Sequence, residues 1–270
     1  MISRNDAYVF ECVVVDMNTQ TDFCSVGGAH PVMNHESLIP ELRRVVAWTK
    51  RNGVPVVSSV DSHRERDIQH ASFPPCCVDG SDGQTKVSFT IMPSSARVEV
   101  DNTLSIPLNL FSTFQQLLFR MRDGDLLSNP KADRFLTQLA TRQFLVVGNV
   151  LEKAVKTLVL GLLTRRKEVA VVVEACGYWN KPTSELALRQ MVAKGATLIS
   201  VDDLLLRRLT NRRRYRQALR NGKNGNGHRT NGKHSGGSSR FASLRVDQLP
   251  SAVQAARMSR KNGREHPGRP

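Results

Sequence analysis

The sequence has no long hydrophobic run. No apolar stretch in its 270 residues approaches the roughly 20 residues that a transmembrane helix requires. The N-terminal segment MISRNDAYVFECVVVD also lacks the charged, apolar and small-residue regions of a signal peptide. These absences predict a cytoplasmic protein that has no membrane partner.

Cysteine is scarce, and its number is odd. The chain has five cysteines, dispersed along its length: Cys12, Cys24, Cys76, Cys77 and Cys176. An odd and dispersed set does not suit a disulfide framework, so we expect reduced thiols. Cys12 lies in an apolar strand-like segment and is most simply a core residue.

Acidic residues are almost missing from the C-terminal part of the chain. Residues 207–270 contain 17 Lys and Arg against 2 Asp and Glu, whereas residues 1–206 contain 22 of each kind. The stretch NGKNGNGHRTNGKHSGGSSR has too few apolar residues to fold. We therefore expect a neutral domain over residues 1–206, followed by a largely disordered basic tail that begins with a helical extension.

The basic tail can attract phosphate groups without reading a base sequence. Its aromatic residues, Tyr215 and Phe241, are isolated, so base stacking is not indicated. Two interpretations stay open: a weak contact with nucleic acid or the ribosome, and a solvated extension without a dedicated partner.

Strand-like and helix-like patterns alternate in the first two hundred residues. The predicted strands cover residues 8–16, 54–61, 144–147, 169–175 and 196–201, and the predicted helices cover residues 36–52, 131–142, 181–194 and the segment from 152 onward. Such alternation is typical of a parallel sheet with helices on both faces. The sequence therefore predicts a three-layer α/β/α sandwich.

In sheets of this kind, ligands bind beyond the carboxyl ends of the strands. Those ends carry Asp16, Asp61, the turn at Gly148 and Glu174. The turn should present backbone N–H groups and a helix N-terminus. Residues 148–154 nevertheless include no Ser, Cys, His or Thr that could attack a substrate.

Several stretches together resemble the isochorismatase-like hydrolases, particularly the nicotinamidases. The similar stretches are VVVDMNTQTDFCSVGGAHPV, VPVVSSVDSH, FPPCCVDGSDGQTKVSFT and FLVVGNVLEKAVKTLVLGLL. QQLLFRMRDGDLLSNPKADRFL looks like the segment that supplies the catalytic lysine of that family. The resemblance extends over residues 8–201 in the same order and implies the same α/β/α fold.

In that family an Asp, a Lys and a Cys form a triad, and backbone N–H groups of the turn bind the oxyanion. The resemblance places Asp16 on the aspartate, Met121 on the lysine and Ala154 on the cysteine. It implies that Val150 and Ala154 provide the oxyanion-hole N–H groups and that the Asn149–Val150 peptide bond is cis.

Met121 would leave Asp16 without a lysine partner, although other side chains can replace the missing charge. The candidates are Lys86, Lys131, Arg120 and Arg122. Cys24 and Cys176 are the thiols that could in principle replace the nucleophile, but nucleophile geometry tolerates little displacement.

The resemblance also implies a divalent metal site, with zinc or a similar ion. Asp61 and His63 form the Asp-x-His arrangement of the family, Cys76 takes the usual position of a histidine ligand, and His70 is a candidate fourth ligand. A thiolate is a good zinc ligand, so Cys76 favours softer metals. No organic cofactor is indicated.

Two functions follow from this sequence. The first is a catalytically impaired relative that binds a metal or a small-molecule ligand, because triad members act as a unit. The second is an altered hydrolase that acts on an amide or a vinyl ether through Asp16 and a metal-bound water. True isochorismatases cleave a vinyl ether with the Asp as acid and without a cysteine, but they retain the lysine. Members of the family often form homo-oligomers.

Overall fold

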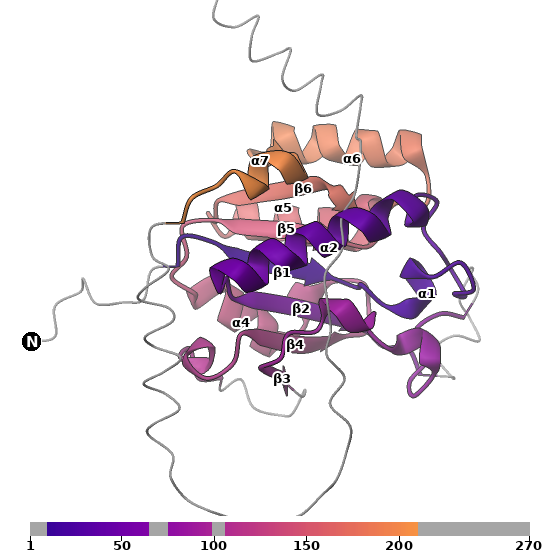
Figure 1. Ribbon diagram of the computed structural model, residues 1–270, viewed down its shortest axis with the longest axis horizontal. Coiled ribbons are helices and arrows are strands. Elements are labelled where there is room, and N and C mark those ends of the chain that lie inside the picture. Colours follow the sequence, from indigo (N-terminus) through magenta and orange to yellow (C-terminus); the bar gives the residue numbers. More distant parts are fainter. Residues whose placement is uncertain (1–9, 65–74, 99–105, 210–270) are drawn as a thin grey trace, which may run out of the picture.

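The computed structural model describes residues 10–64, 75–98 and 106–209, which form one parallel sheet between two layers of helices (Figure 1). The sheet has seven strands in the order β3-β4-β2-β1-β5-β6-β7, and every pairing is parallel. The strands are β1 (Val13–Met17), β2 (Val56–Asp61), β3 (Ser95–Val98), β4 (Gln116–Met121), β5 (Phe144–Gly148), β6 (Val169–Cys176) and β7 (Thr197–Ile199).

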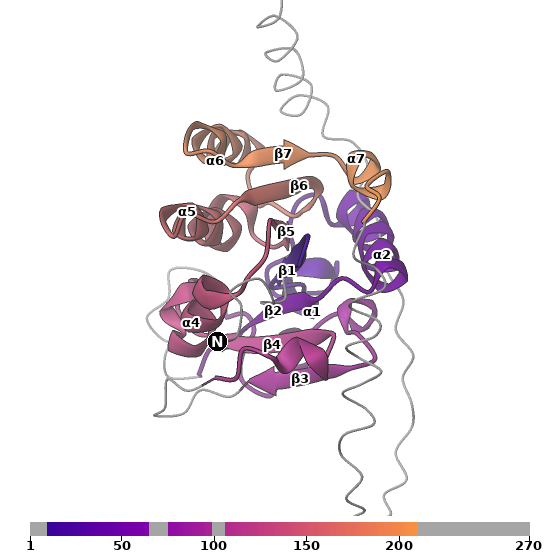
Figure 2. The same cartoon turned by 90° about the vertical axis from the view of Figure 1, so that its left-hand side faces the viewer.

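Helices cover both faces of the sheet, as the sequence predicts. The α-helices are α1 (Thr21–Cys24), α2 (His35–Asn52), α4 (Pro130–Gln138), α5 (Lys156–Thr164), α6 (Lys181–Ala193) and α7 (Val201–Leu205). Helices α2 and α7 lie on one face, and α4, α5 and α6 lie on the other (Figure 2). Within the described residues, no helix is long and apolar enough to span a membrane.

Short helical turns connect these elements. Four are 3-10 helices, η1 (Asp82–Gln84), η2 (Ser88–Thr90), η3 (Leu110–Ser112) and η4 (Leu126–Ser128), and η5 (Leu151–Val155) is a π-helix. The π-helix lies between β5 and α5, at the turn that the sequence marks as a candidate site. Such π-turns occur frequently at functional sites.

The apolar runs form the inner strands because parallel strands are buried on both faces. All residues of β1, β5 and β6 are buried, and two apolar clusters fill the space on either side of the sheet. Helix α2 ends as predicted at Gly53, which has the left-handed conformation of a C-terminal cap (φ 65°).

Two strands, β3 and β4, are absent from the sequence-based prediction, and some boundaries differ from the predicted ones. Polar residues interrupt β4, since it begins with the buried Gln116 and contains the half-buried Arg120. Strand β3 is short and half-exposed at the edge of the sheet. Helix α4 ends at Gln138, where Leu139 turns to an extended conformation, instead of at residue 142. Residues 210–270, which include most of the predicted basic tail, lie outside the described residues.

The strand order reverses between β1 and β5. After β1 the chain passes along α2 to β2 and then to the β3–β4 edge, and it returns through α4 on the opposite face to β5 (Figure 2). Strands β1 and β5 pair directly, with Met17 opposite Gly148. This reversal of direction is the point at which open α/β sheets bind ligands.

Candidate functional site

Asp16 lies near the carboxyl end of β1 and forms a buried ion pair with Lys86. Lys86 Nζ is 2.9 Å from Asp16 Oδ2, and the two side chains are 2% and 7% exposed. The Thr19 hydroxyl donates to Asp16 Oδ1 at 2.8 Å, and the Ser58 hydroxyl donates to Oδ2 at 3.0 Å. Lys86 Nζ also donates to Thr19 Oγ1 at 2.7 Å. Both charges are therefore compensated and hydrogen-bonded, as buried charges must be.

Lys86 reaches Asp16 because two loops pair with each other. Gln20 and Lys86 form an antiparallel bridge, the Thr21 N–H donates to the Thr85 carbonyl at 2.9 Å, and the Val87 N–H donates to the Thr19 carbonyl at 2.8 Å. The expectation that Asp16 has lost its lysine partner is wrong. The lysine comes from the loop before η2 and not from the end of β4.

The two arginine candidates have another partner. Arg122 Nη2 is 3.3 Å from Asp79 Oδ2, and Arg120 Nη1 is 3.8 Å from Asp79 Oδ1, so the two arginines pair with Asp79 and not with Asp16. Lys131 is buried in the first turn of α4.

Met121 occupies the position at which the resemblance expects the lysine. It is the last residue of β4, lies opposite Asp61 on β2, and is 1% exposed. It belongs to the same apolar cluster as Ala154 and Met17. Two positions at which the resemblance expects reactive side chains therefore contribute to the hydrophobic core.

The turn after β5 has the predicted backbone. The Asn149–Val150 peptide bond is cis, and Gly148 has φ 107°. The Asn149 N–H donates to the Met17 carbonyl at 2.7 Å, so the turn wraps around the end of β1. Val150 and Ala154 are 3% and 6% exposed. The turn is tightly held, and the role of its N–H groups in binding an oxyanion stays a prediction.

Two thiols lie near this turn, but neither is poised to act as a nucleophile. Cys24 Sγ accepts a hydrogen bond from Asn149 Nδ2 at 3.1 Å, and burial raises the pKa of the Cys24 thiol to about 12. Cys176 is 1% exposed, and burial raises the pKa of its thiol as well. Because the thiolate is the attacking species, burial makes both cysteines poor nucleophiles near neutral pH.

The predicted metal ligands are only partly assembled. Asp61 Oδ2 lies 3.3 Å from His63 Nε2, and a hydrogen bond from the Cys77 thiol lowers the pKa of Cys76. Within residues 10–64, 75–98 and 106–209, no three His, Cys, Asp or Glu side chains are arranged to hold a metal ion. His70 lies outside the described residues. The described residues alone do not fit a complete zinc site.

Glu174 has a structural contact at the carboxyl end of β6. Its Oε2 accepts a hydrogen bond from the Val201 N–H at 2.7 Å, at the start of α7. Burial raises the pKa of this carboxyl group. The contact fixes α7 against the sheet, away from the Asp16–Lys86 pair.

Several solved structures have the same fold. A pyrazinamidase of Pyrococcus horikoshii in complex with zinc aligns with a TM-score of 0.57 and 19% identity, over 70% of this chain and 99% of that chain. An isochorismatase-like hydrolase from Alkaliphilus metalliredigens gives a TM-score of 0.59 and 14% identity, over 72% and 97%. A nicotinamidase/pyrazinamidase from Bacillus subtilis gives 0.57 and 15%, over 71% and 100%. At these identities the likeness establishes the fold alone.

No curated protein sequence gives a significant match to the chain. The model of the isochorismatase domain, however, matches residues 12–203. That range contains all seven strands, the Asp16–Lys86 pair and the cis turn. The chain therefore belongs to the isochorismatase family.

Proposed function

We propose that this protein is a catalytically impaired member of its family, which uses the family frame to bind a small ligand without covalent thiol chemistry. The observation that carries the proposal is the alanine at position 154, four residues after the cis peptide bond, where the resemblance expects the nucleophilic cysteine. A methyl group at that position cannot form a covalent intermediate.

The surroundings of Ala154 support the same conclusion. Cys24, a thiol near the turn, is buried and protonated, so it does not supply a replacement thiolate. Asp16 already accepts hydrogen bonds from Thr19, Ser58 and Lys86, which suits a stable core ion pair. These contacts hold the Asp16 carboxylate in place, and without a thiol at position 154 it has no nucleophile whose proton it could accept as general base.

The test combines ligand binding and product formation on the same samples of full-length protein. The panel consists of nicotinamide, simple amides and isochorismate, each titrated by calorimetry and then assayed for product. Saturable binding of a panel member without product supports the proposal. Product formed by the wild-type protein and retained in Cys24→Ser, but lost in Asp16→Asn, contradicts it.

A second candidate function is favoured by the intact Asp16–Lys86 pair. The resemblance implies that true isochorismatases cleave a vinyl ether with an Asp acid, a Lys and no cysteine, and this chain has both charged groups in contact. In this alternative the Asp16 carboxyl group protonates the terminal vinyl carbon, water adds to the resulting oxocarbenium carbon, and the proton released by that water restores the Asp16 carboxyl group. The hemiketal C–O bond then breaks to give an alcohol and a ketone. Isochorismate turnover that disappears in Asp16→Asn supports it, whereas turnover indifferent to that change assigns the activity to another site or a contaminant.

Zinc binding stays a separate prediction. Its support is the contact between Asp61 and His63, the lowered pKa of Cys76, and a zinc-containing structural relative. The measurement is the zinc content per chain of the wild-type protein and of His63→Ala. Stoichiometric zinc that is lost in the variant supports the prediction, and equal contents in the two proteins contradict it.

A further inference from the structure

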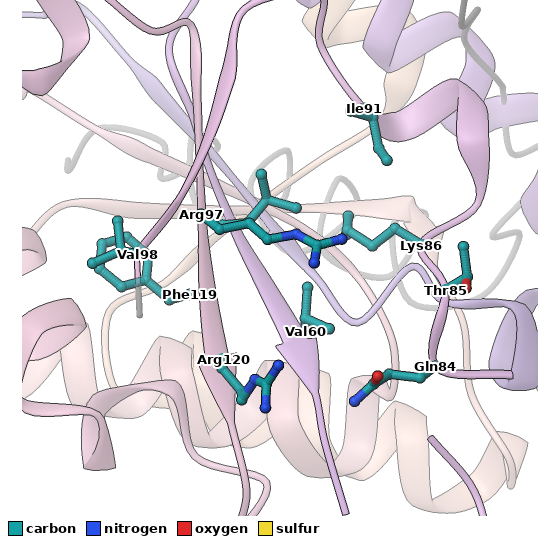
Figure 3. Close-up of a pocket in the computed structure, with 10 residues that line it drawn as sticks. Val60, Gln84, Thr85, Lys86, Ile91, Arg97, Val98, Phe119 and Arg120 are labelled. Atoms are coloured by element: carbon teal, nitrogen blue, oxygen red, sulfur yellow. The ribbon is translucent and has the colours of Figure 1, made fainter. Parts of the chain in front are cut away.

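A cavity of about 120 Å³ opens beside the Asp16–Lys86 pair, between the strands β2, β3 and β4 and the loop that carries Lys86 (Figure 3). Its lining residues are Val60, Gln84, Thr85, Lys86, Ile91, Arg97, Val98, Leu118, Phe119 and Arg120. This volume is slightly smaller than the roughly 150 Å³ cavity that admits benzene in an engineered protein. It therefore suits a ligand with only a few non-hydrogen atoms.

The charged residues that line this cavity in the described part of the chain are all basic. They are Lys86, Arg97 and Arg120, and no Asp or Glu of the described residues joins them. Lys86 is not available to a ligand, because its ammonium faces Asp16 at 2.9 Å. Arg97 extends from β3 across the cavity toward Lys86, and the guanidinium of Arg120 points toward Val60 and Gln84 (Figure 3). Two guanidinium groups thus remain for an incoming ligand.

The two arginines differ in their existing partners. Among the described residues no carboxylate lies within ion-pair distance of Arg97. Arg120 has a weak partner, because Asp79 Oδ1 lies 3.8 Å from its Nη1 and the Arg120 side chain is 37% exposed. At that exposure and distance an ion pair contributes little to stability.

Asp79 is itself held by other groups. Burial would raise the pKa of Asp79, but hydrogen bonds from Ser62 and Gln84, together with Arg122 and Arg120, hold it below the usual value. Arg122 lies closer to Asp79 than Arg120 does, at 3.3 Å. An anion in the cavity can therefore pair with Arg120 in place of Asp79, and Asp79 still pairs with Arg122.

We infer that this cavity binds a small oxyanion, a carboxylate or a phosphate, between Arg97 and Arg120. Guanidinium groups bind both oxyanions through paired N–H donors, which is the chemistry that the two side chains offer here. The apolar side chains of Val60, Ile91 and Leu118 line the rest of the cavity and suit a short hydrocarbon substituent. The inference rests on the proposed ligand-binding function and gives it a ligand class.

The test is calorimetric titration of the full chain with three probes: inorganic phosphate, propionate and propionamide. Propionamide has nearly the shape of propionate without its charge. The variants are Arg97→Gln and, as a matched loss of one positive charge, Arg189→Gln on the exposed face of α6. Arg97 is exposed, so its replacement leaves the fold intact, and a urea unfolding curve verifies this.

The expected result is saturable binding of phosphate, propionate or both, weakened about tenfold or more in Arg97→Gln and unchanged in Arg189→Gln. The anion that responds identifies the ligand class. If anion binding weakens equally in Arg97→Gln and Arg189→Gln, it depends on the overall positive charge of the protein, including the basic tail, and not on this cavity. That result overturns the inference. Propionamide binding as tight as propionate binding overturns it too. The anion titrations test the ligand class alone. The proposed loss of catalysis is tested separately, by measuring product formation.

Discussion

Lys86 Nζ lies 2.9 Å from Asp16 Oδ2, and both groups are buried against the carboxyl end of the central strand β1. The two residues come from segments that are far apart in the sequence and are joined by a short antiparallel bridge between loops. The pair places a buried lysine against the aspartate of the central strand, although position 154 has no thiol. A buried Asp–Lys pair beside a turn without a nucleophilic side chain is the central feature of this site.

Replacement of Lys86 by Met should destabilise the protein by roughly 3–5 kcal/mol, because it leaves Asp16 as an uncompensated buried charge. Urea unfolding measures the loss. The double variant Asp16→Asn with Lys86→Met should recover part of it, since no charge remains buried without a partner. Lys181→Met, at an exposed position of α6, is the control and should change stability by less than about 0.5 kcal/mol. Equal effects of the two lysine replacements would contradict the buried pair.

Cys24 should react slowly with iodoacetamide in the native protein at about pH 8, because burial raises the pKa of its thiol to about 12. Peptide mass spectrometry follows the labelling of this residue with time, in buffer and in concentrated urea. Rapid labelling is expected only in urea. Labelling in buffer at the rate seen in urea would mean that Cys24 is an accessible thiolate and would reopen its role as a nucleophile.

The buried Glu174 should make stability fall as the pH rises. Burial raises its native pKa, so the native state binds this proton more tightly than the unfolded state does. The resulting stabilisation is complete below the ordinary glutamate pKa of about 4.3 and is lost as the pH rises through the native value. Glu174→Gln should flatten this part of the pH profile of unfolding free energy, and the exposed Glu168→Gln should not. Identical profiles for the two variants would refute the assignment.

Gly148→Ala should cost clearly more stability than Gly195→Ala. Both glycines have φ 107°, so both replacements include backbone strain of the order of 1–3 kcal/mol. A Cβ atom at Gly148 would collide with the Met17 carbonyl, whereas a Cβ atom at Gly195 has no neighbour within 4 Å. Thermal or urea unfolding of the two variants gives the difference. Equal losses would show that the turn at Gly148 is not packed tightly against β1.

The part of the fold that could be predicted from sequence depends on continuous apolar runs. Strands β1, β5 and β6 read as such runs because they are buried on both faces, and Gly53 marks the end of α2. Strand β4 could not be predicted in this way, since the polar residues Gln116 and Arg120 interrupt its pattern. Gln116 is buried because its side chain donates to Ser58 Oγ at 2.8 Å, a contact that sequence periodicity does not express.

The candidate site shows the same division. Asp16 and the turn at Gly148 lie at strand ends, and the rule for parallel sheets locates them together. Lys86 lies in a loop without periodicity, and only the pairing of residues 19–21 with residues 85–87 brings it to Asp16. A linear alignment of the segment LFRMRD selects Met121 instead. The lysine of a buried ion pair is thus defined by tertiary contact, and local sequence does not identify it.

The most direct test of the central claim is the rate of product formation from nicotinamide and from isochorismate by the wild-type protein and by Asp16→Asn, purified in parallel. The account predicts that neither protein forms product above the uncatalysed rate, because Ala154 has no nucleophile and Asp16 is committed to its pair with Lys86. Product formation by the wild-type protein that disappears in Asp16→Asn would contradict the account and identify a hydrolase that works without a cysteine.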